Sequence, residues 1–137
     1  MKETNILQKV IPSAVNSLLS IGGALLFQPI LSNWKILAIV LFFLLNLFFL
    51  FRSDRREIGM LLVGTFWAQK YSIWNHIIFA VFYTLSFSTL LIWVWFPFDL
   101  FLFNILLLQL PFLLKTNTTF HGYISGEMTT VMKENKR

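Results

Sequence analysis

The stretch ILAIVLFFLLNLFFLF, which covers residues 36–51, is apolar at every position except Asn46. A membrane-spanning helix needs about 20 mostly apolar residues, with a range of about 17 to 25. With Trp34 and Lys35 in front of it the stretch has that length, and Trp is a residue type that membrane interfaces favour. We therefore predict that residues 34–51 cross a membrane.

The composition of the whole chain agrees with this prediction. Of its 137 residues, 57% are hydrophobic and 12% are charged, whereas a soluble domain has about 25% charged residues. A water-soluble monomer of this size cannot bury so much apolar surface, and disordered chains are rich in charge and poor in aromatic residues. Both of these classes are therefore excluded.

Three further spans are predicted from the gaps between charged residues. They cover residues 10–30, 73–96 and 100–114, with a tight turn at Pro97, Phe98 and Asp99, because proline disfavours a helical residue before it. One kinked helix over residues 73–114 is the alternative, but at about 1.5 Å per residue it is longer than a bilayer is thick. We therefore predict one all-α membrane domain over residues 1–137 with four transmembrane helices, a cytoplasmic linker at 52–72 and a cytoplasmic tail at 115–137.

The basic residues predict the orientation, because Lys and Arg are enriched in cytoplasmic loops. With four spans, all of the 11 Lys and Arg residues except Lys35 lie on the side of the two termini. Both termini are therefore predicted to be cytoplasmic. The abundance of Phe, Ile, Asn and Lys is typical of an AT-rich bacterial genome, and we expect the bacterial cytoplasmic (inner) membrane. This arrangement explains the pI of about 9.8, so the partner is the lipid bilayer and no nucleic acid is expected.

A stripe of small and polar residues runs along the first span. Its members recur at spacings of three and four, which places them on one face of a helix: Ser13, Asn16, Ser17, Ser20, Gly23 and Ala24. Small residues let helix backbones approach closely, and Ser or Asn can form hydrogen bonds across the contact. The stripe predicts a packing face, and a face lining a solute path is the alternative.

Other polar groups lie in the remaining spans. His76 has an ordinary pKa of about 6.5, which allows proton exchange near neutrality, but it lies close to the predicted interface and an interfacial or packing role is favoured. Asn46, Asn104 and Gln109 each need a hydrogen-bond partner, since lipid offers none. Interhelical hydrogen bonds are expected for all three, and the positions of Asn46 and Gln109 in the inner half of their spans suggest that they meet.

Two segments outside the spans have residues that favour strands. Residues 64–69 and 128–133 are short and contain Thr, Val and aromatic side chains. They predict a small two-stranded cap on the cytoplasmic face, and an interfacial helix over residues 58–67 is the alternative.

The linker and the tail also carry recognisable motifs. In the linker, GMLLVG places Gly59 and Gly64 five residues apart. In the tail, His121 is followed by apolar and small residues, then by Gly126 and a β-branched stretch that ends at Val131. In the first span, Lys9 and Asn16 are seven residues apart.

In order and spacing, these motifs resemble those of the RDD family of small membrane proteins, from Lys9 to Val131. That family has an arginine and an aspartate at the positions of Lys9 and Asn16, a lysine at Met60, and a second aspartate at Gly122. The resemblance implies a small polytopic membrane protein, and RDD proteins have been associated with transport, including sodium–proton exchange. Because both family aspartates are neutral residues here, the resemblance does not favour a mechanism that depends on them.

The sequence offers little for catalysis. It has no Cys, no HExxH motif, no glycine-rich phosphate loop and no pair of carboxylates in a span, so we expect no enzyme, no catalytic residue and no cofactor. Two histidines are too few for a zinc site, so no metal is expected.

Two functions remain from different classes. The favoured one is a structural, accessory or regulatory subunit that forms a homo-oligomer or joins a larger membrane-protein complex. The alternative is transport of ions or small solutes by a homo-oligomer, with proton coupling. Its candidate lining residues are Ser13, Asn16, Ser20, Asn46, His76 and Gln109.

Overall fold

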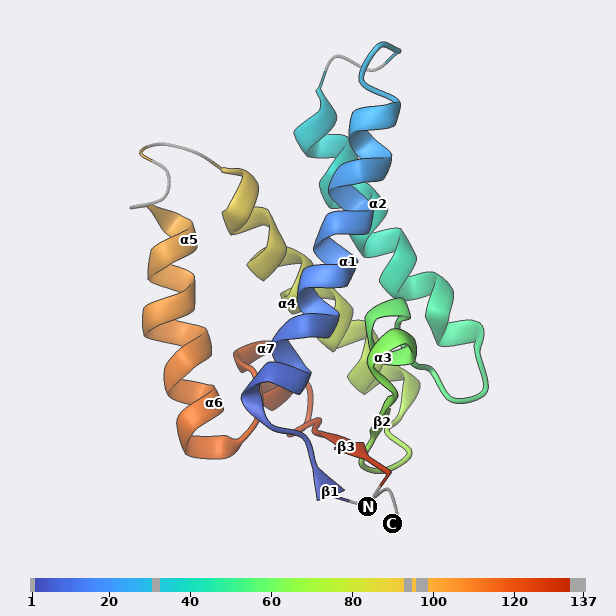
Figure 1. The fold of residues 1–137 in the computed structure, drawn as a ribbon, viewed down its shortest axis with the longest axis vertical. Helices are drawn as coiled ribbons and strands as arrows, with labels where there is room; N and C mark the ends of the chain where they lie inside the picture. Colours follow the sequence, from blue (N-terminus) through green and yellow to red (C-terminus); the bar gives the residue numbers. More distant parts are fainter. Residues whose placement is uncertain (1, 31–32, 93–94, 96–98, 134–137) are drawn as a thin grey trace.

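The computed structural model describes residues 2–30, 33–92, 95 and 99–133, and the chain is mainly helical (Figure 1). Among these residues, three helices are long and apolar enough to cross a membrane: Ile6–Leu26, Trp34–Phe51 and Ile73–Leu91. They correspond to α1 (Ile6–Leu26), α2 (Trp34–Phe48) with the 3₁₀ turn η1 (Phe49–Phe51), and α4 (Ile73–Leu91). Their order agrees with the first three predicted spans.

The first span begins earlier than predicted. Asn5 caps α1 through a capping box: its side chain accepts from Gln8 N at 2.9 Å, and Gln8 Oε1 accepts from Asn5 N at 2.9 Å. The helix therefore covers residues 6–26 rather than 10–30, and Pro12 lies inside it. A local polar pair set this boundary, and hydrophobicity alone did not indicate it.

The second and third spans follow the prediction more closely. The second, Trp34–Phe51, has the predicted bounds. The third starts at Ile73 as predicted, where Ser72 accepts from Asn75 N at 3.2 Å, and it ends at Leu91 instead of residue 96. The turn predicted at Pro97, Phe98 and Asp99 lies outside the described residues except for Asp99, which caps the next helix.

The fourth predicted span is a shorter apolar helical segment, Leu100–Thr116. It consists of α5 (Leu100–Phe103), the π-helical turn η2 (Asn104–Gln109) and α6 (Leu110–Thr116). In Figure 1 this segment runs back toward the end of the molecule where α1 begins. It leads into the short helix α7 (Phe120–Ile124).

A three-stranded antiparallel sheet lies at that end. Strand β3 (Thr130–Met132) is central and pairs with both β2 (Thr65–Trp67) and β1 (Lys2–Glu3). The predicted pairing of residues 64–69 with 128–133 is therefore confirmed, and β1 is a third strand that the sequence did not indicate. Residues 58–67, the alternative interfacial helix, divide into α3 (Ile58–Val63) and β2, with Gly64 at φ 78° ending the helix.

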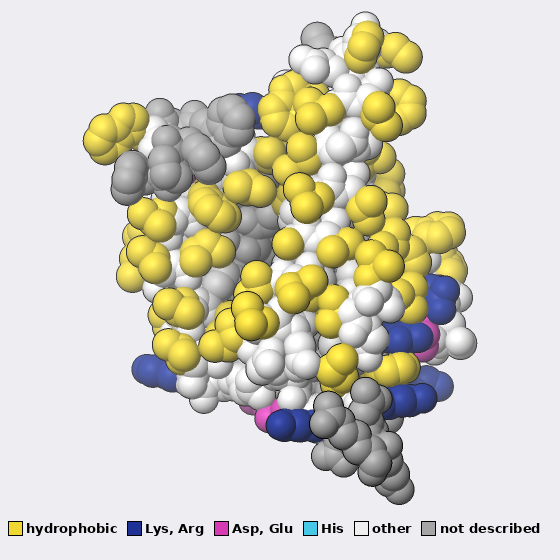
Figure 2. Space-filling model, viewed as in Figure 1, with side chains coloured by type: hydrophobic (Ala, Val, Ile, Leu, Met, Phe, Trp, Pro, Cys, Tyr) yellow, Lys and Arg dark blue, Asp and Glu magenta, His cyan; other side chains and the backbone are white. Residues whose placement is uncertain are grey.

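The long helices pack around an aromatic core. Phe42 of α2 is fully buried, with its ring stacked on Phe87 at 4.2 Å and edge-on to Tyr83 at 4.8 Å. Ala24 and Ala38, both fully buried, allow α1 and α2 to approach closely. On the face drawn in Figure 2, hydrophobic side chains are spread over the helices, while Lys and Arg gather mainly at the end that carries the sheet.

Helix α3 lies directly against α1. A Cβ on Gly59 would overlap the backbone of Pro12, whose Cα would lie 2.5 Å away and whose carbonyl carbon 2.7 Å away. Both atoms belong to the main chain, so they cannot move aside as a flexible side chain can. The absence of a side chain at Gly59 is therefore a condition for this contact.

We expect Gly59→Ala to destabilise the protein by about 1–3 kcal/mol, because the added methyl group forces α3 away from α1. The measurement is thermal unfolding in mild detergent. Gly22→Ala is the matched control, since a Cβ on Gly22 meets nothing within 4 Å. Equal unfolding temperatures for the two variants would contradict the packing described here.

Candidate functional site

The amide of Asn16 joins α1 to the start of α3. Its Nδ2 donates to Glu57 Oε2 at 2.6 Å, and its Oδ1 accepts from the backbone N of Gly59 at 3.0 Å. Asn16 is buried, and Ser20 one turn later donates to the Asn16 carbonyl at 3.0 Å. Both ends of one neutral amide are thus used to hold α3 in place.

Glu57 is a buried carboxyl group at this junction. It is the residue before α3, and its side chain lies against α1, with only 8% of the residue exposed. Burial raises the pKa of Glu57 to about 7, and the hydrogen bond from Asn16 works against this rise. Glu57 lies in the predicted cytoplasmic linker of residues 52–72 and was not among the predicted site residues. The structure corrects this, because the docking of α3 removes the carboxyl group from water.

Tyr83, from α4, lies near this carboxyl group, and His121, from α7, packs on Tyr83. Tyr83 of α4 donates to Ser13 Oγ at 2.8 Å, and Asn16 Nδ2 lies 3.5 Å from Tyr83 Oη. The His121 ring of α7 stacks on Tyr83, with centroids 4.5 Å apart and planes 13° apart. Burial lowers the pKa of His121 to about 3, so its imidazole is neutral at physiological pH.

A cavity of about 50 Å³ connects these groups. Its lining includes Ser13, Glu57, Tyr83, His121 and Thr65. Within the described part of the chain, His121 Nδ1 and Thr65 Oγ1 are buried without a hydrogen-bond partner. A water molecule needs about 10–15 Å³ of such volume, so the cavity has room for a few waters that would satisfy these atoms.

The chemistry of this arrangement is proton binding. Glu57 is the group that can exchange a proton near neutral pH, whereas His121 remains neutral there. Over residues 2–30, 33–92, 95 and 99–133, the structure brings together no group of three or more His, Asp or Glu side chains that could hold a metal ion.

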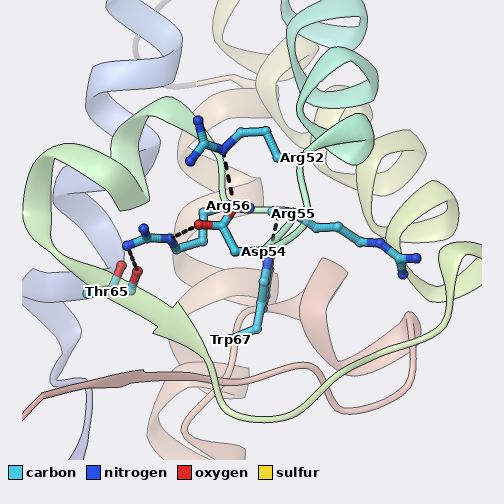
Figure 3. Close-up of polar contacts among 6 residues, drawn as sticks. All are labelled: Arg52, Asp54, Arg55, Arg56, Thr65 and Trp67. Atoms are coloured by element: carbon cyan, nitrogen blue, oxygen red, sulfur yellow. Dashed lines mark hydrogen bonds and ion pairs between the residues drawn. The ribbon is translucent and has the colours of Figure 1, made fainter.

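A polar network holds the loop before Glu57 (Figure 3). Asp54 accepts from Arg52 Nε at 3.1 Å and from Arg56 Nε at 2.7 Å, and Trp67 Nε1 donates to the Arg55 carbonyl at 2.9 Å. Partial burial acts to raise the pKa of Asp54, but the hydrogen bonds from both arginines outweigh it and hold this pKa well below its ordinary value. The loop is therefore tied to β2, and this fixes the position of Glu57.

The amides of the fourth helical segment form a second cluster. Gln109 Nε2 donates to Ser86 Oγ at 2.9 Å and lies 3.3 Å from Asn104 Oδ1, while Asn104 Nδ2 donates to Ser86 Oγ at 2.8 Å. In an α-helix, residues five apart point about 140° away from each other. The π-helical turn, with hydrogen bonds from i to i+5, brings Asn104 and Gln109 to one face. Interhelical hydrogen bonding, as expected for these two amides, is thus present at Ser86 of α4.

Asn46 and His76 are two further predicted polar positions, and Asn46 lines a small space together with Asn16, Ser20 and Glu57. Asn46 donates to its own helix at Phe42 O, at 2.8 Å, and Gln109 bonds to Ser86 and Asn104, so the suggested meeting of Asn46 and Gln109 is wrong. His76 is buried and packs edge-on against Trp67, with centroids 5.3 Å apart, which agrees with a packing role.

The RDD-like positions in α1 and the tail occupy contact sites. Lys9 Nζ donates to the carbonyl and, at 2.8 Å, to Oδ1 of Asn117, and so links α1 to the residues that follow α6. A Cβ on Gly122 would lie 2.5 Å from Thr118 Oγ1 and 2.9 Å from Met128 O, which leaves no room for a side chain. Gly126 has φ 112°, a conformation that glycine adopts readily.

No family model, curated protein or solved structure matches this chain.

Sequence reasoning found several members of the main site and missed others. Ser13, Asn16 and His121 were singled out, and the structure brings them together. Glu57, Tyr83 and Thr65 were not. The available signal was the position of Glu57, a lone acid directly before the apolar stretch IGMLLV.

The raised pKa of Glu57 has a definite sign for stability. Between its ordinary value of 4.5 and about pH 7, the folded chain holds a proton that the unfolded chain has lost, so this group's contribution to stability falls as pH rises. His121 acts in the opposite direction, because between about pH 3 and 6.5 the unfolded chain binds the proton. In the wild type, the two groups therefore have opposite effects on how stability changes with pH.

The effect of Glu57 is isolated by comparing the wild type with Glu57→Gln, which is neutral at every pH. We expect the variant to gain stability relative to the wild type as pH rises from 4.5 to 7, by on the order of 3 kcal/mol. The measurement is thermal unfolding in detergent at pH 5 and pH 8, with Glu127→Gln at an exposed position as the control. A difference between wild type and Glu57→Gln that does not change with pH would show that Glu57 is not buried as described.

Proposed function

We propose that this chain is an RDD-like membrane protein with four spans and both termini in the cytoplasm, and that it acts as a structural, accessory or regulatory subunit of a complex in the bacterial cytoplasmic membrane. The proposal has three parts, which are the topology, the family resemblance and the role.

The adjacent ends of the chain support the topology. Strands β1 and β3 pair, so residues 2–3 and 131–132 lie side by side. Three crossings would leave the two ends on opposite faces of a bilayer, so their pairing favours the segment Leu100–Thr116 as a returning fourth crossing. At 17 residues it is at the short end of the spanning range. The basic residues concentrated at the same end favour the cytoplasmic side.

The RDD resemblance is supported by how the motif positions are used. Gly59 allows α3 to lie on α1, Asn16 bonds to the backbone N of Gly59, and Lys9 bonds to Asn117. Motifs far apart in the sequence thus meet at one junction between the long helices and the sheet.

The role of a subunit rests on one observation: beyond the polar site around Asn16 and Glu57, buried apolar side chains fill the core between the long helices. Further along the helices the space between α1, α2 and α4 is filled by Ala24, Ala38, Phe42, Phe87 and Leu91, all buried. Water and ions find no polar groups in such a layer to replace their hydration. A single chain therefore has no favourable solute path through these residues, and its polar groups serve to hold helices together.

The topology can be tested by cysteine labelling, because the chain has no Cys of its own. We expect Gln28→Cys, which is exposed after α1, to react with a membrane-impermeant maleimide added outside intact cells. Lys115→Cys, exposed at the end of α6, is expected to react only after the membrane is permeabilised. Labelling of Lys115→Cys in intact cells, with Gln28→Cys protected, would reverse the proposed orientation.

Proton-linked transport by a homo-oligomer is a second candidate, and Glu57 is the observation that favours it. A buried carboxyl group that exchanges a proton near neutrality is a common element of proton-coupled carriers. In that case the path would have to run between chains, because the core within one chain is closed.

Proton flux into liposomes loaded with a pH-sensitive dye distinguishes the two functions. We expect the reconstituted protein to give no flux above empty liposomes under an imposed potential, because the aromatic layer blocks the path. Native mass spectrometry of the protein extracted from its own membrane is expected to show a stable heteromer. Flux that Glu57→Gln or Asn16→Ala abolishes, in a protein that is a homo-oligomer, would favour transport instead.

A further inference from the structure

A long groove runs beside α1 on the surface of the helical part. It has a volume of about 500 Å³ and is bounded by α1, by α4 and by the segment from α5 to α6. Figure 2 shows this hollow between the hydrophobic side chains of α1 and those of the α5–α6 segment. The groove is open to the surface that is embedded in lipid if these helices cross a membrane.

The groove is long enough for one lipid tail. Its lining on α1 extends from Ile6 to Ile21, which is about 22 Å of helix, and one leaflet of the hydrocarbon core is about 15 Å deep.

The walls of the groove suit an apolar occupant. Most lining side chains are aliphatic or aromatic, among them Val10, Leu18 and Leu90. Several polar lining groups already have partners within the chain: Ser86 bonds to Asn104 and Gln109, and Ser13 accepts from Tyr83, whereas Nδ1 of the lining residue His121 has none. An acyl tail would therefore leave no polar group of these residues newly unsatisfied.

The two ends of the groove differ in charge. Lys9 lines the end near the sheet, and Lys115, exposed, follows two residues after the lining residue Leu113. The acid at this end is Glu3, which accepts from Asn117 Nδ2 at 2.7 Å. At the opposite end, the acid Asp99 lies two residues before the lining residue Phe101 and accepts from its backbone N. A phosphate is favoured at the Lys9 end and disfavoured at the other.

We propose that this groove is a binding site for one anionic phospholipid, with an acyl tail between α1 and the α5–α6 segment and the phosphate beside Lys9. The site is independent of whether the chain is a subunit or a transporter. Its orientation places the lipid in the leaflet on the side of the sheet.

The proposal is tested by native mass spectrometry of the full chain in mild detergent, with palmitoyl-oleoyl phosphatidylglycerol or phosphatidylcholine added at equal concentrations. We expect one retained phosphatidylglycerol per chain, with at least fivefold higher occupancy than phosphatidylcholine. The two lipids have identical tails, so the difference reports the headgroup alone.

Two pairs of variants separate the tail from the headgroup. Ala14→Phe fills the groove and is expected to reduce retention of both lipids at least fivefold, whereas Gly22→Phe, exposed on the same helix outside the groove, retains them. Lys9→Gln, whose amide can still donate to Asn117, is expected to remove the preference for phosphatidylglycerol while tail binding remains. Lys35→Gln is the control for loss of a positive charge elsewhere.

Several outcomes would overturn the site. Equal lipid retention by Ala14→Phe and wild type would show that the tail lies elsewhere, and an unchanged lipid preference in Lys9→Gln would remove the headgroup assignment. A dimer that Ala14→Phe dissociates, without any bound lipid, would mean that a second copy of the chain occupies the groove. Unfolding temperatures of all four variants show whether each is folded. If Lys9→Gln does not fold, the comparison of Ala14→Phe with Gly22→Phe decides whether the groove binds a lipid.

Discussion

The amide of Asn16 is the contact on which the polar end of this molecule depends. Its oxygen accepts from Gly59 N and its nitrogen donates to Glu57, so one side chain in a long apolar helix positions both the start of α3 and a buried carboxyl group. Without a donor at this position, the Glu57 carboxyl would lose the hydrogen bond that offsets part of its burial. The fit of Gly59 against Pro12 and the cavity beside Tyr83 both depend on α3 being held in this place.

A neutral amide suits this position better than a charged side chain would. The groups around it, Tyr83, Ser13 and His121, are uncharged at neutral pH or weakly polar, and a second charge beside Glu57 would have to be removed from water as well. The same solution recurs at Asn104 and Gln109, where two amides and one hydroxyl satisfy one another inside the helical part. The carboxyl group at this junction comes from Glu57, directly before α3, and not from a residue of the long helices.

Much of the helical architecture could be predicted from where charges are absent, because a long uncharged apolar stretch has few alternatives to a buried or membrane-embedded helix. The pairing of residues 64–69 with 128–133 also followed from local strand preference. The start of α1 did not, since it depends on the exchange of hydrogen bonds between Asn5 and Gln8. The burial of Glu57 and the π-helical turn depend on contacts between segments far apart in sequence. The spacing of residues within one segment does not indicate such contacts.

The order of the strands has a consequence for the synthesis of this protein. Strand β3 lies between β1 and β2, so residues 2–3 find their partner only when residues 131–132 have been made. The helices from α1 to α7 are all synthesised before β3 and can form one after another before β1 is paired. Closure of the sheet therefore follows the formation of these helices, and a nascent protein stalled before residue 130 would have the helices but no sheet.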